Sequence, residues 1–309
     1  MLCQVFILLN LKKSLQIYNK VVHGGQIFIV IYTLIMYNTI VRKDKNMKKI
    51  VCFNQKGGTG KSTSVVNICG CLDVEKNKKC LVLDCDSQMN STSYLTTYQG
   101  LDSETSIVEC LNNQKISDTD IIPVNTFYKR EIATKISLIP ASKEIDYLDF
   151  EDLSVLSKLL EEYESKYDYC FFDCPPHLSN LTLMALASAD YVLIPALADT
   201  DSLGGYDSLI DTINGIRSSG LNLKIKILGI FFNNVESNKA LDKYILDNFT
   251  SNMNENVFKT YIKRTSLIPQ ARFYGKPIAY YKPSSDCEKN YLKLVNEMIR
   301  RINKLEKEK

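Results

Sequence analysis

The sequence predicts one α/β domain: a single doubly wound, mostly parallel sheet with helices on both faces. Three observations predict this class. Short apolar runs alternate with helical stretches, and the runs are apolar throughout, as in parallel strands covered on both sides. A glycine-rich turn joins the first run to a helical stretch, which is the order of a phosphate-binding loop. Two later runs end in aspartate at their carboxyl side.

From Met47 onward, the expected elements follow in order. The first strand, Lys49–Asn54, leads through the glycine-rich turn into a helix that continues through Leu72. Further strands are expected at Cys80–Asp84, Tyr169–Asp173, Tyr191–Pro195 and Lys224–Phe232. Further helices are expected at Glu151–Tyr167, Asn180–Ser188, Ser202–Arg217, Asn238–Asn248 and Asp286–Leu305. The polar segment 112–130 is predicted to be a loop.

Length and composition describe an ordinary soluble globular chain. Of 309 residues, 45% are hydrophobic and 24% charged, which excludes the disordered and fibrous classes. The formal net charge is +3, but residues 1–46 hold six Lys/Arg and one acid, against 32 and 34 in the remainder. The overall charge therefore gives no argument for a nucleic-acid partner.

Residues 1–46 differ from everything after them. Gln26–Val41 is a strongly apolar run, but its sixteen residues fall short of the ~20 that span a bilayer. Its charges follow the run, so a signal peptide is not indicated. A weak membrane anchor is one interpretation. We favour another, in which translation starts at Met47, residues 1–46 are no part of the native fold, and residues 47–309 form the domain.

The cysteines indicate a reducing compartment. There are ten, without CxxC pairs or a Cys/His cluster, so they do not predict a disulfide or zinc framework. Most lie in apolar runs, where a thiol behaves as a small hydrophobe. The expected location is therefore the cytoplasm.

The glycine-rich turn carries the strongest chemical signal. Its glycines allow successive backbone N–H groups to point at phosphate oxygens, and the following helix adds about half a positive charge at its N-terminus. Lys61 would reach the β- and γ-phosphates, and the Ser62 hydroxyl would ligate Mg²⁺. The leading glycine usual in such loops is absent, and a turn without a ligand is the alternative. The predicted phosphate-binding residues are Lys56, Gly57, Gly58, Thr59, Gly60, Lys61, Ser62 and Thr63.

The run K-G-G-T-G-K-S-T from Lys56 to Thr63 resembles the deviant Walker A motif of the ParA/MinD family of P-loop ATPases. The resemblance implies that Lys56 crosses a dimer interface and touches the nucleotide of the partner subunit. Such a group resembles an arginine finger, which is worth ~10³–10⁵ in rate where it has been measured. ATP binding and dimer formation would then be joined through Lys56.

Two acidic segments complete the expected site. The segment beginning at Asp84 resembles the family's DxDPQxNxT sequence, with Ser87 in place of proline. Two acids at the end of a strand beside a phosphate loop can hold Mg²⁺ and orient the attacking water. The resemblance makes Asp86 the aspartate needed for hydrolysis and Asp173 the Walker B aspartate. The expected metal site is thus Ser62, Asp84, Asp86 and Asp173, and the expected catalytic residues are Lys56, Lys61 and Asp86. For Asp84 and Asp86, a solvated strand end is the alternative.

Cys170 and Cys174 flank the last of these aspartates. Their position suggests a comparison with the nitrogenase iron protein, a relative that carries an iron–sulfur cluster between subunits. Cys170 lies within the expected strand and no second well-spaced pair follows. We therefore interpret both as core or near-core thiols.

The resemblance covers Met47 to about Arg301 and fits the ParA/Soj branch best. MinD is the nearest alternative, but it needs an amphipathic C-terminal helix for membrane attachment, and the residues after Ile302 are polar. The branch implies an ATP-dependent homodimer, weak hydrolysis of MgATP, nonspecific binding to nucleoid DNA, and a ParB-like partner that stimulates hydrolysis. No stable membrane association is expected. The family also suggests Asn233 as a contact to the adenine base.

The C-terminal segment is basic where the whole chain is not. Residues 259–309 contain thirteen Lys/Arg and five acids. A patch of this kind binds phosphates in a salt-dependent manner, although a solvated basic face is the bland alternative. Arg264 aligns with an arginine that the family uses for DNA, and Leu267 stands where a second arginine is often found. The predicted DNA-binding residues are Lys263, Arg264, Arg272 and Lys276.

Three classes of function remain from the sequence. The first is a DNA-partition ATPase for a plasmid, chromosome or mobile element. The second is a MinD-like membrane-associated spatial regulator. The third is a regulatory ATP-binding protein that pairs without turnover.

Overall fold

The computed structural model of the protein describes residues 47–97, 105–128, 130–199, 201–236, 238–252 and 256–308. The expectation for residues 1–46 and the proposed start at Met47 concern a segment outside the described residues. Residues 47–309 form one compact unit. No helix of the described ranges is both long enough and apolar enough to traverse a bilayer.

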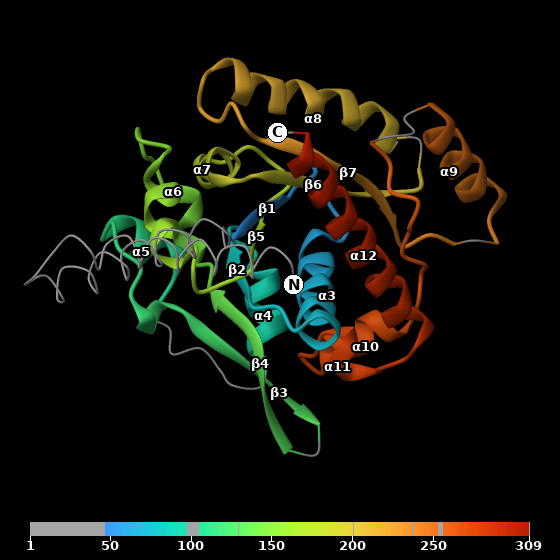
Figure 1. Cartoon of the computed structure of the whole chain (residues 1–309), viewed down its shortest axis with the longest axis horizontal. Helices are drawn as coiled ribbons and strands as arrows, with labels where there is room; N and C mark the ends of the chain where they lie inside the picture. Colours follow the sequence, from blue (N-terminus) through green and yellow to red (C-terminus); the bar gives the residue numbers. More distant parts are fainter. Residues whose placement is uncertain are drawn as a thin grey trace, which may run out of the picture. The chain divides into compact units, whose positions relative to one another are not determined.

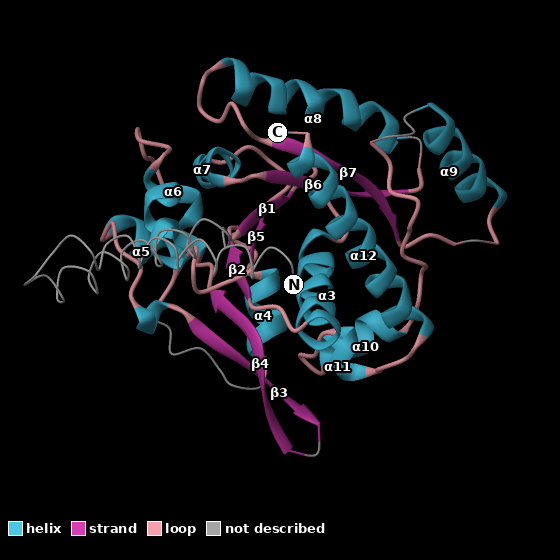
Figure 2. Cartoon of the chain, viewed as in Figure 1, coloured by secondary structure: helices cyan, strands magenta, loops and turns pink. Residues whose placement is uncertain are grey.

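The described strands form one seven-stranded sheet in the order β3–β4–β2–β5–β1–β6–β7. All neighbours pair in parallel except β3 and β4, which are antiparallel. Figure 2 shows the strands passing through the middle of the domain. The strands are β1 (Lys48–Cys52), β2 (Cys80–Asp84), β3 (Ile122–Tyr128), β4 (Arg130–Ile139), β5 (Tyr169–Asp173), β6 (Tyr191–Leu197) and β7 (Lys226–Asn233).

The described helices cover both faces of the sheet (Figure 1). The core on one face is completed by α3 (Lys61–Lys76), α4 (Asn90–Thr96), α10 (Leu267–Phe273), α11 (Ile278–Tyr281) and α12 (Asp286–Lys307). The core on the other face is completed by α5 (Ile107–Asn112), α6 (Val155–Leu160), α7 (Asn180–Ser188), α8 (Asp201–Ser218) and α9 (Ala240–Asn252). The predicted doubly wound α/β fold is confirmed.

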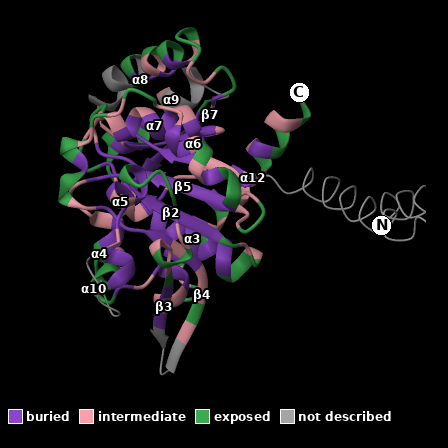
Figure 3. Cartoon of the chain, turned by 90° about the vertical axis from the view of Figure 1, so that its left-hand side faces the viewer, coloured by how far each residue is buried: buried purple, intermediate pink, exposed green. Residues whose placement is uncertain are grey.

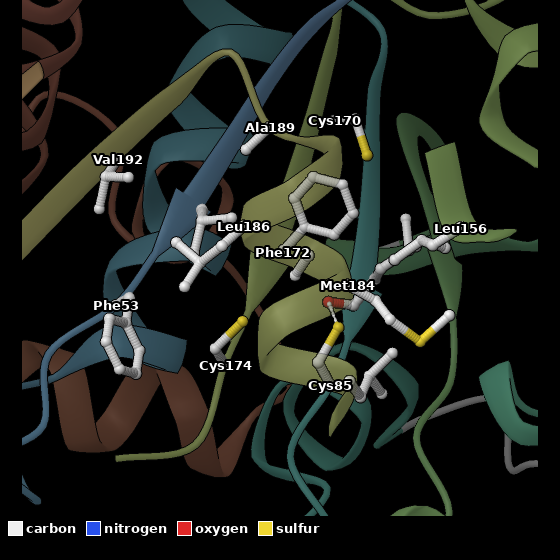
Figure 4. Packing of buried hydrophobic residues seen from close by; sticks show 14 of the residues in the cluster. Phe53, Cys85, Leu156, Cys170, Phe172, Cys174, Met184, Leu186, Ala189 and Val192 are labelled. Atoms are coloured by element: carbon white, nitrogen blue, oxygen red, sulfur yellow. Dashed lines mark hydrogen bonds between the residues drawn. The ribbon is translucent and has the colours of Figure 1, made fainter. Parts of the chain in front are cut away.

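Burial explains why the strands read as unbroken apolar runs. Every residue of β2 and β5 is buried, because helices lie on both sides of these central strands. Figure 3 shows buried residues along the central strands and exposed residues on the outer faces of the helices. The nine described cysteines are free and buried. Figure 4 shows three of them, Cys85, Cys170 and Cys174, among the packed side chains, and burial raises the pKa of the Cys170 thiol.

Most expected elements are confirmed, with ends that differ by a few residues. The final helix, expected at Asp286–Leu305, runs over Asp286–Lys307, and its start is capped by the Ser285 side chain, which accepts from the Glu288 N–H. The strand expected at Lys224–Phe232 is β7, which extends to Asn233.

The prediction of a loop over residues 112–130 is wrong. Part of this segment is β3, which pairs with β4 as an antiparallel hairpin at the edge of the sheet. The hairpin extends beyond the neighbouring strands (Figure 1). The apolar residues of β3 (IPVNTFY) are interrupted by Pro123, Asn125 and Thr126, which an edge strand tolerates, so its sequence lacks the unbroken apolar run of a central strand. A register shift between Pro123 and Asn125 further breaks the pattern.

The helix predicted at Glu151–Tyr167 is much shorter than expected. It covers Val155–Leu160 and then tightens into a 3₁₀ turn over Glu161–Tyr163. The Tyr163 hydroxyl donates to the Ile116 carbonyl at 2.9 Å, which holds the end of the helix against the preceding loop. The short helices α10 and α11 had no counterpart in the sequence prediction.

Candidate nucleotide site

The glycine-rich turn lies at the carboxyl end of β1, directly before α3. Gly58 and Gly60 have φ values of 74° and 85°, a region that favours glycine. A Cβ on Gly60 would collide with the Asn233 side chain, whereas one on Gly57 or Gly58 would meet nothing within 4 Å. The loop is therefore closely packed at Gly60 and open at Gly57 and Gly58, which is the shape that a phosphate group requires.

The Asn54 side chain anchors the start of the loop. Its amide donates to the Pro195 carbonyl of β6 at 2.7 Å, and its Oδ1 accepts from the Lys56 N–H at 2.9 Å. One side chain thus joins the start of the loop to the neighbouring strand. The sequence prediction gave Asn54 no role, although an asparagine before a turn is a known signal for local backbone hydrogen bonding.

Lys61 is the first residue of α3 and is only 7% exposed. Its ammonium donates to the carbonyls of Asn54 at 3.2 Å and Lys56 at 3.4 Å. Both of these partners are neutral, so the contacts place the positive charge beside the loop without cancelling it. A triphosphate bound in the loop would supply the opposite charge.

Lys56 is held within its own chain in this structure. Its Nζ lies 2.6 Å from Asp199 Oδ2, and both side chains are about one-third exposed at 30% and 35%. Asp199 follows β6, so the contact ties the loop to the next strand of the sheet. A surface pair of this kind is weak, about 0–1 kcal/mol, and can be exchanged for another partner.

Asp84 and Asp173 lie side by side at the ends of neighbouring strands. They are paired in register between β2 and β5, and both side chains are fully buried. Burial raises the pKa of both carboxyl groups, and the nearby charge of Asp173 raises that of Asp84 further. Two such groups in one buried site favour a cation that neutralises them.

The start of α4 satisfies two of the four carboxylate oxygens of this pair, and the Asp86 N–H satisfies a third. Asp84 Oδ2 accepts from both the N–H and the hydroxyl of Thr92 at 2.8 Å, and its Oδ1 accepts from the Asp86 N–H at 3.2 Å. Asp173 Oδ2 accepts from the Ser91 hydroxyl at 2.6 Å. Asp173 Oδ1 is buried without a hydrogen-bond partner. The sequence prediction gave no role to Ser91 or Thr92, although both lie in the segment that resembles DxDPQxNxT and Thr92 matches its last residue.

The orphaned oxygen makes Asp173 the better candidate ligand for Mg²⁺. The Ser62 hydroxyl lies close enough to lower the pKa of Asp173 against the effect of burial, so these two groups converge on one place. A hydroxyl and a carboxylate are the oxygen donors that Mg²⁺ prefers. Asp84 is instead occupied by hydrogen bonds to Thr92, which positions α4.

Asp86 closes the turn that leads to α4. Its Oδ1 accepts from the Gln88 N–H at 2.9 Å, and its carbonyl accepts from the Met89 N–H at 2.8 Å. Met89 has a positive φ of 54°, which is uncommon outside glycine. The turn is therefore closed by Asp86 itself, although Ser87 stands where the family has proline.

Asn233 lies beside the loop. Its amide donates to the Thr59 carbonyl at 3.0 Å, and its Oδ1 accepts from the Asn234 N–H at 2.9 Å. Both ends of this side chain are thus engaged with backbone in this structure, and contact with an adenine base stays a prediction. Thr59 lies in the loop and Thr63 in the first turn of α3, and the Thr59 hydroxyl is buried without a hydrogen-bond partner.

The predicted DNA-binding residues lie at two places in the structure, one beyond β7 and one beside α4. Arg264 Nη1 lies 2.5 Å from Glu236 Oε1, next to a bridge that joins Lys263 to Val235 beyond β7. Arg272 on α10 donates to Asn90 Oδ1 at 2.8 Å, at the start of α4. The Lys276 carbonyl accepts from the hydroxyl of Tyr94, which also lies on α4, at 3.2 Å.

Leu267, at the position where the family often has a second arginine, packs against the core. It is the first residue of α10, and the helix turns this side chain inward. The lost arginine is therefore replaced by a packing residue rather than by another surface group.

Comparisons with known proteins agree with this geometry. A family model described as "AAA domain" matches residues 47–227. The Soj protein of Bacillus subtilis, a sporulation initiation inhibitor, is 32% identical over 82% of this chain and 98% of its own length. The chromosome-partitioning ATPase Soj of Treponema pallidum is 33% identical over the same shares.

The chain belongs to the ParA/Soj family.

Solved structures show the same fold at lower identity. A plasmid partition protein of Borrelia burgdorferi bound to AMPPNP has a TM-score of 0.64 and 24% identity, covering 84% of this chain and 99% of its own. The ATP complex of a Cyanothece McdA variant has a TM-score of 0.69 and 20% identity, with 83% and 97% covered. Both of these structures were solved with a nucleotide or its analogue.

Proposed function

We propose that this ParA/Soj-family chain is a DNA-partition ATPase that binds MgATP, pairs face to face around two nucleotides and hydrolyses them slowly. The observation that carries the proposal is the presence of two lysines, Lys56 and Lys61, on one open glycine-rich loop beside two buried carboxylates. Lys61 alone suffices to bind a triphosphate within one subunit. Lys56 gives the loop a second cation with which to reach a nucleotide in a partner.

Each residue has a defined role in the proposed reaction. The loop N–H groups and Lys61 bind the β- and γ-phosphates, which neutralises their charge. Ser62 and Asp173 hold Mg²⁺, which supplies further positive charge to the same oxygens when it is bound. Asp86 orients the attacking water. Lys56 exchanges Asp199 for the γ-phosphate of the partner subunit as the dimer closes.

Nucleic acid is the proposed partner of the ATP-bound dimer. The basic C-terminal segment supplies Lys263, Arg264, Arg272 and Lys276 for nonspecific contacts to DNA phosphates. Hydrolysis, stimulated by a ParB-like protein, separates the dimer and releases the DNA. The relatives named as chromosome-partitioning ATPases support this assignment.

One sedimentation experiment tests the whole proposal. The chain is mixed with plasmid DNA or with anionic liposomes in the presence of ATP, ADP or no nucleotide. We expect the chain to sediment with DNA when ATP is present, but not with ADP or without nucleotide. The variant Lys61→Ala should remove it, and Lys263→Glu with Arg264→Glu should abolish DNA sedimentation while leaving ATP binding intact. Sedimentation with liposomes instead would support a membrane organiser, and ATP-driven pairing without turnover would support a purely regulatory protein.

The end of the chain does not favour the membrane organiser. Ile302 of α12 is buried and Leu305 packs against the same core, so these apolar side chains are committed to the domain. The liposome measurement nevertheless remains in the design because it separates the two functions directly.

A further inference from the structure

The helices α10 and α11 carry an aromatic surface that the proposed function does not use. Phe273 is 76% exposed and Tyr274 is 43% exposed. The rings of Phe273 and Tyr274 are nearly perpendicular at a centroid distance of 5.3 Å. Tyr274 stacks on Tyr281 at 5.6 Å, with an interplanar angle of 18°. Phe273 and Tyr274 thus form one exposed aromatic surface, and the partly buried Tyr281 supports it by stacking on Tyr274.

Positive charge surrounds these rings. The segment from Lys259 to Ser285 contains six Lys/Arg and no Asp or Glu. Arg272 and Lys282 flank the rings in sequence, and both are exposed. Arg272 donates to the neutral amide of Asn90, which leaves its charge uncancelled by that contact. We name Arg272, Phe273, Tyr274, Tyr281 and Lys282 the aromatic–basic patch.

The patch stands on a rigid base. The Ile278 N–H donates to Asn67 Oδ1 at 2.6 Å, and the Tyr280 hydroxyl donates to Asp73 Oδ2 at 2.5 Å, so α11 is fixed to α3. A Cβ on Gly70 of α3 would collide with Pro277, which shows how closely the two segments approach. The Tyr281 hydroxyl donates to Gln270 at 3.0 Å and fixes its own ring. The rings are therefore pre-organised for a ligand, which limits the entropy lost on binding.

The combination of rings and cations selects the partner. Exposed aromatic faces stack on nucleobases of any sequence, and cations follow the phosphates between them. Double-stranded DNA presents phosphates but keeps its bases stacked on one another, so it would leave the rings unused. A second copy of this chain is disfavoured, because a two-fold contact through the patch would bring two acid-free segments together.

We propose that the aromatic–basic patch binds single-stranded nucleic acid, with Phe273 and Tyr274 stacking on bases, Tyr281 supporting Tyr274, and Arg272 and Lys282 holding phosphates. The proposal rests on the proposed function in one respect, since both place nucleic acid on the C-terminal basic segment. It differs in requiring unpaired bases.

Binding of a labelled oligothymidylate of about twenty nucleotides to the full chain tests the proposal, measured by fluorescence anisotropy with and without ATP. The double variant Phe273→Ala with Tyr274→Ala loses one to two stacked bases. Its binding of oligothymidylate should therefore be weaker by about 10- to 100-fold. Binding of a duplex of the same length should change less than about threefold, since the phosphate contacts remain. The matched control is Tyr244→Ala, which removes a tyrosine on α9 that is 67% exposed, and it should bind as the unsubstituted chain does.

An abasic oligonucleotide separates stacking from charge. It keeps the backbone and lacks bases, so the unsubstituted chain should bind it as weakly as the double variant binds oligothymidylate. Equal binding of the abasic and the thymidine strands would overturn the proposal. So would a double variant that keeps its affinity for oligothymidylate, or one that loses ATP-driven pairing, since the patch would then be a subunit contact.

Crosslinking on the unsubstituted chain avoids any effect of mutation on folding. Irradiation of a bromodeoxyuridine oligonucleotide should attach it to the peptide that contains Phe273 and Tyr274, identified by mass spectrometry. Attachment only at other sites would reject the assignment. If duplex DNA fails to bind in ATP while the thymidine strand still binds through the patch, the proposed function fails and this inference stands.

Discussion

The Ser91 hydroxyl donates to Asp173 Oδ2 at 2.6 Å, and this contact joins the start of α4 to the carboxylate at the end of β5. The next residue, Thr92, holds Asp84 in the same way. Two consecutive hydroxyls of one short helix therefore orient both buried carboxylates. Asp173 Oδ1 is left buried without a hydrogen-bond partner, which is why we propose Asp173 as a ligand of Mg²⁺.

The variant Ser91→Ala should weaken the apparent affinity for Mg²⁺ by about 10- to 100-fold, because partners that orient a metal ligand contribute that much. A Mg²⁺ titration of ATP turnover measures the effect. Ser93→Ala is the matched control, since Ser93 is exposed on the same helix and should leave the titration unchanged. An unaltered Mg²⁺ requirement in Ser91→Ala would remove Asp173 from the metal site.

The variant Lys56→Ala should lose ATP-dependent pairing and at least 100-fold in turnover, as expected for a cation supplied in trans. Binding of a fluorescent ATP analogue should fall much less, because Lys61 remains. Analytical ultracentrifugation and phosphate release measure the two effects. Lys78→Ala removes a comparable surface ion pair with Asp168 and should do neither. If Lys56→Ala kept ATP-dependent pairing and turnover, the proposal would be contradicted, and the protein would be assigned only as a nucleotide-binding protein.

The variant Asp199→Asn should strengthen ATP-dependent pairing by about two- to fivefold. The ion pair with Lys56 contributes about 0–1 kcal/mol, and the lysine no longer has to leave it to reach a partner. The midpoint of dimer formation in sedimentation velocity measures the shift. Weaker pairing in this variant would mean that Asp199 aligns Lys56 for the partner rather than competing for it.

Gly57 and Gly60 should separate ligand binding from folding. Gly60→Ala places a side chain at a φ of 85° against Asn233 and should cost about 1–3 kcal/mol of unfolding free energy. Gly57→Ala meets open space and should leave the unfolding free energy within about 0.5 kcal/mol, while ATP binding is lost because phosphate needs that space. Denaturant unfolding and ATP titration measure the pair. Normal ATP binding in Gly57→Ala would mean that phosphate does not occupy this part of the loop.

Glu297 should make a pH-dependent contribution to the free energy of unfolding, because it binds the backbone at Lys259 and Thr260. Burial raises its pKa, but hydrogen bonds from the Lys259 and Thr260 N–H groups and from Arg301 lower it below 4.5 overall. A lowered carboxyl pKa gives stability that is present above the ordinary value and lost as the pH falls through the lowered one. Glu297→Gln should therefore cost about 1–3 kcal/mol at pH 7 and progressively less below pH 4.5. Urea unfolding across this range measures the difference, with Glu308→Gln on the exposed end as control. A cost that is independent of pH would assign the effect to packing.

The central strands were predictable because burial on both faces makes them apolar from end to end. This is true of Cys80–Asp84 and Tyr169–Asp173, whose closing aspartates the sequence also identified. The edge hairpin was missed although β3 contains strand-forming residues, because Pro123, Asn125 and Thr126 interrupt its apolar residues and its register with β4 is shifted. The sequence prediction missed β3, whose hydrophobic pattern reflects its pairing with β4 at the edge of the sheet.

The sequence by itself determined the glycine-rich loop, its two lysines and the family, since backbone freedom and charge are properties of the residues themselves. Only the tertiary structure decided which groups meet: Lys56 with Asp199, Asn54 with Pro195, and Ser91 with Asp173. Each of these pairs joins residues more than eighty positions apart. A contact of that kind depends on the order in which strands pair, and local sequence patterns do not encode that order.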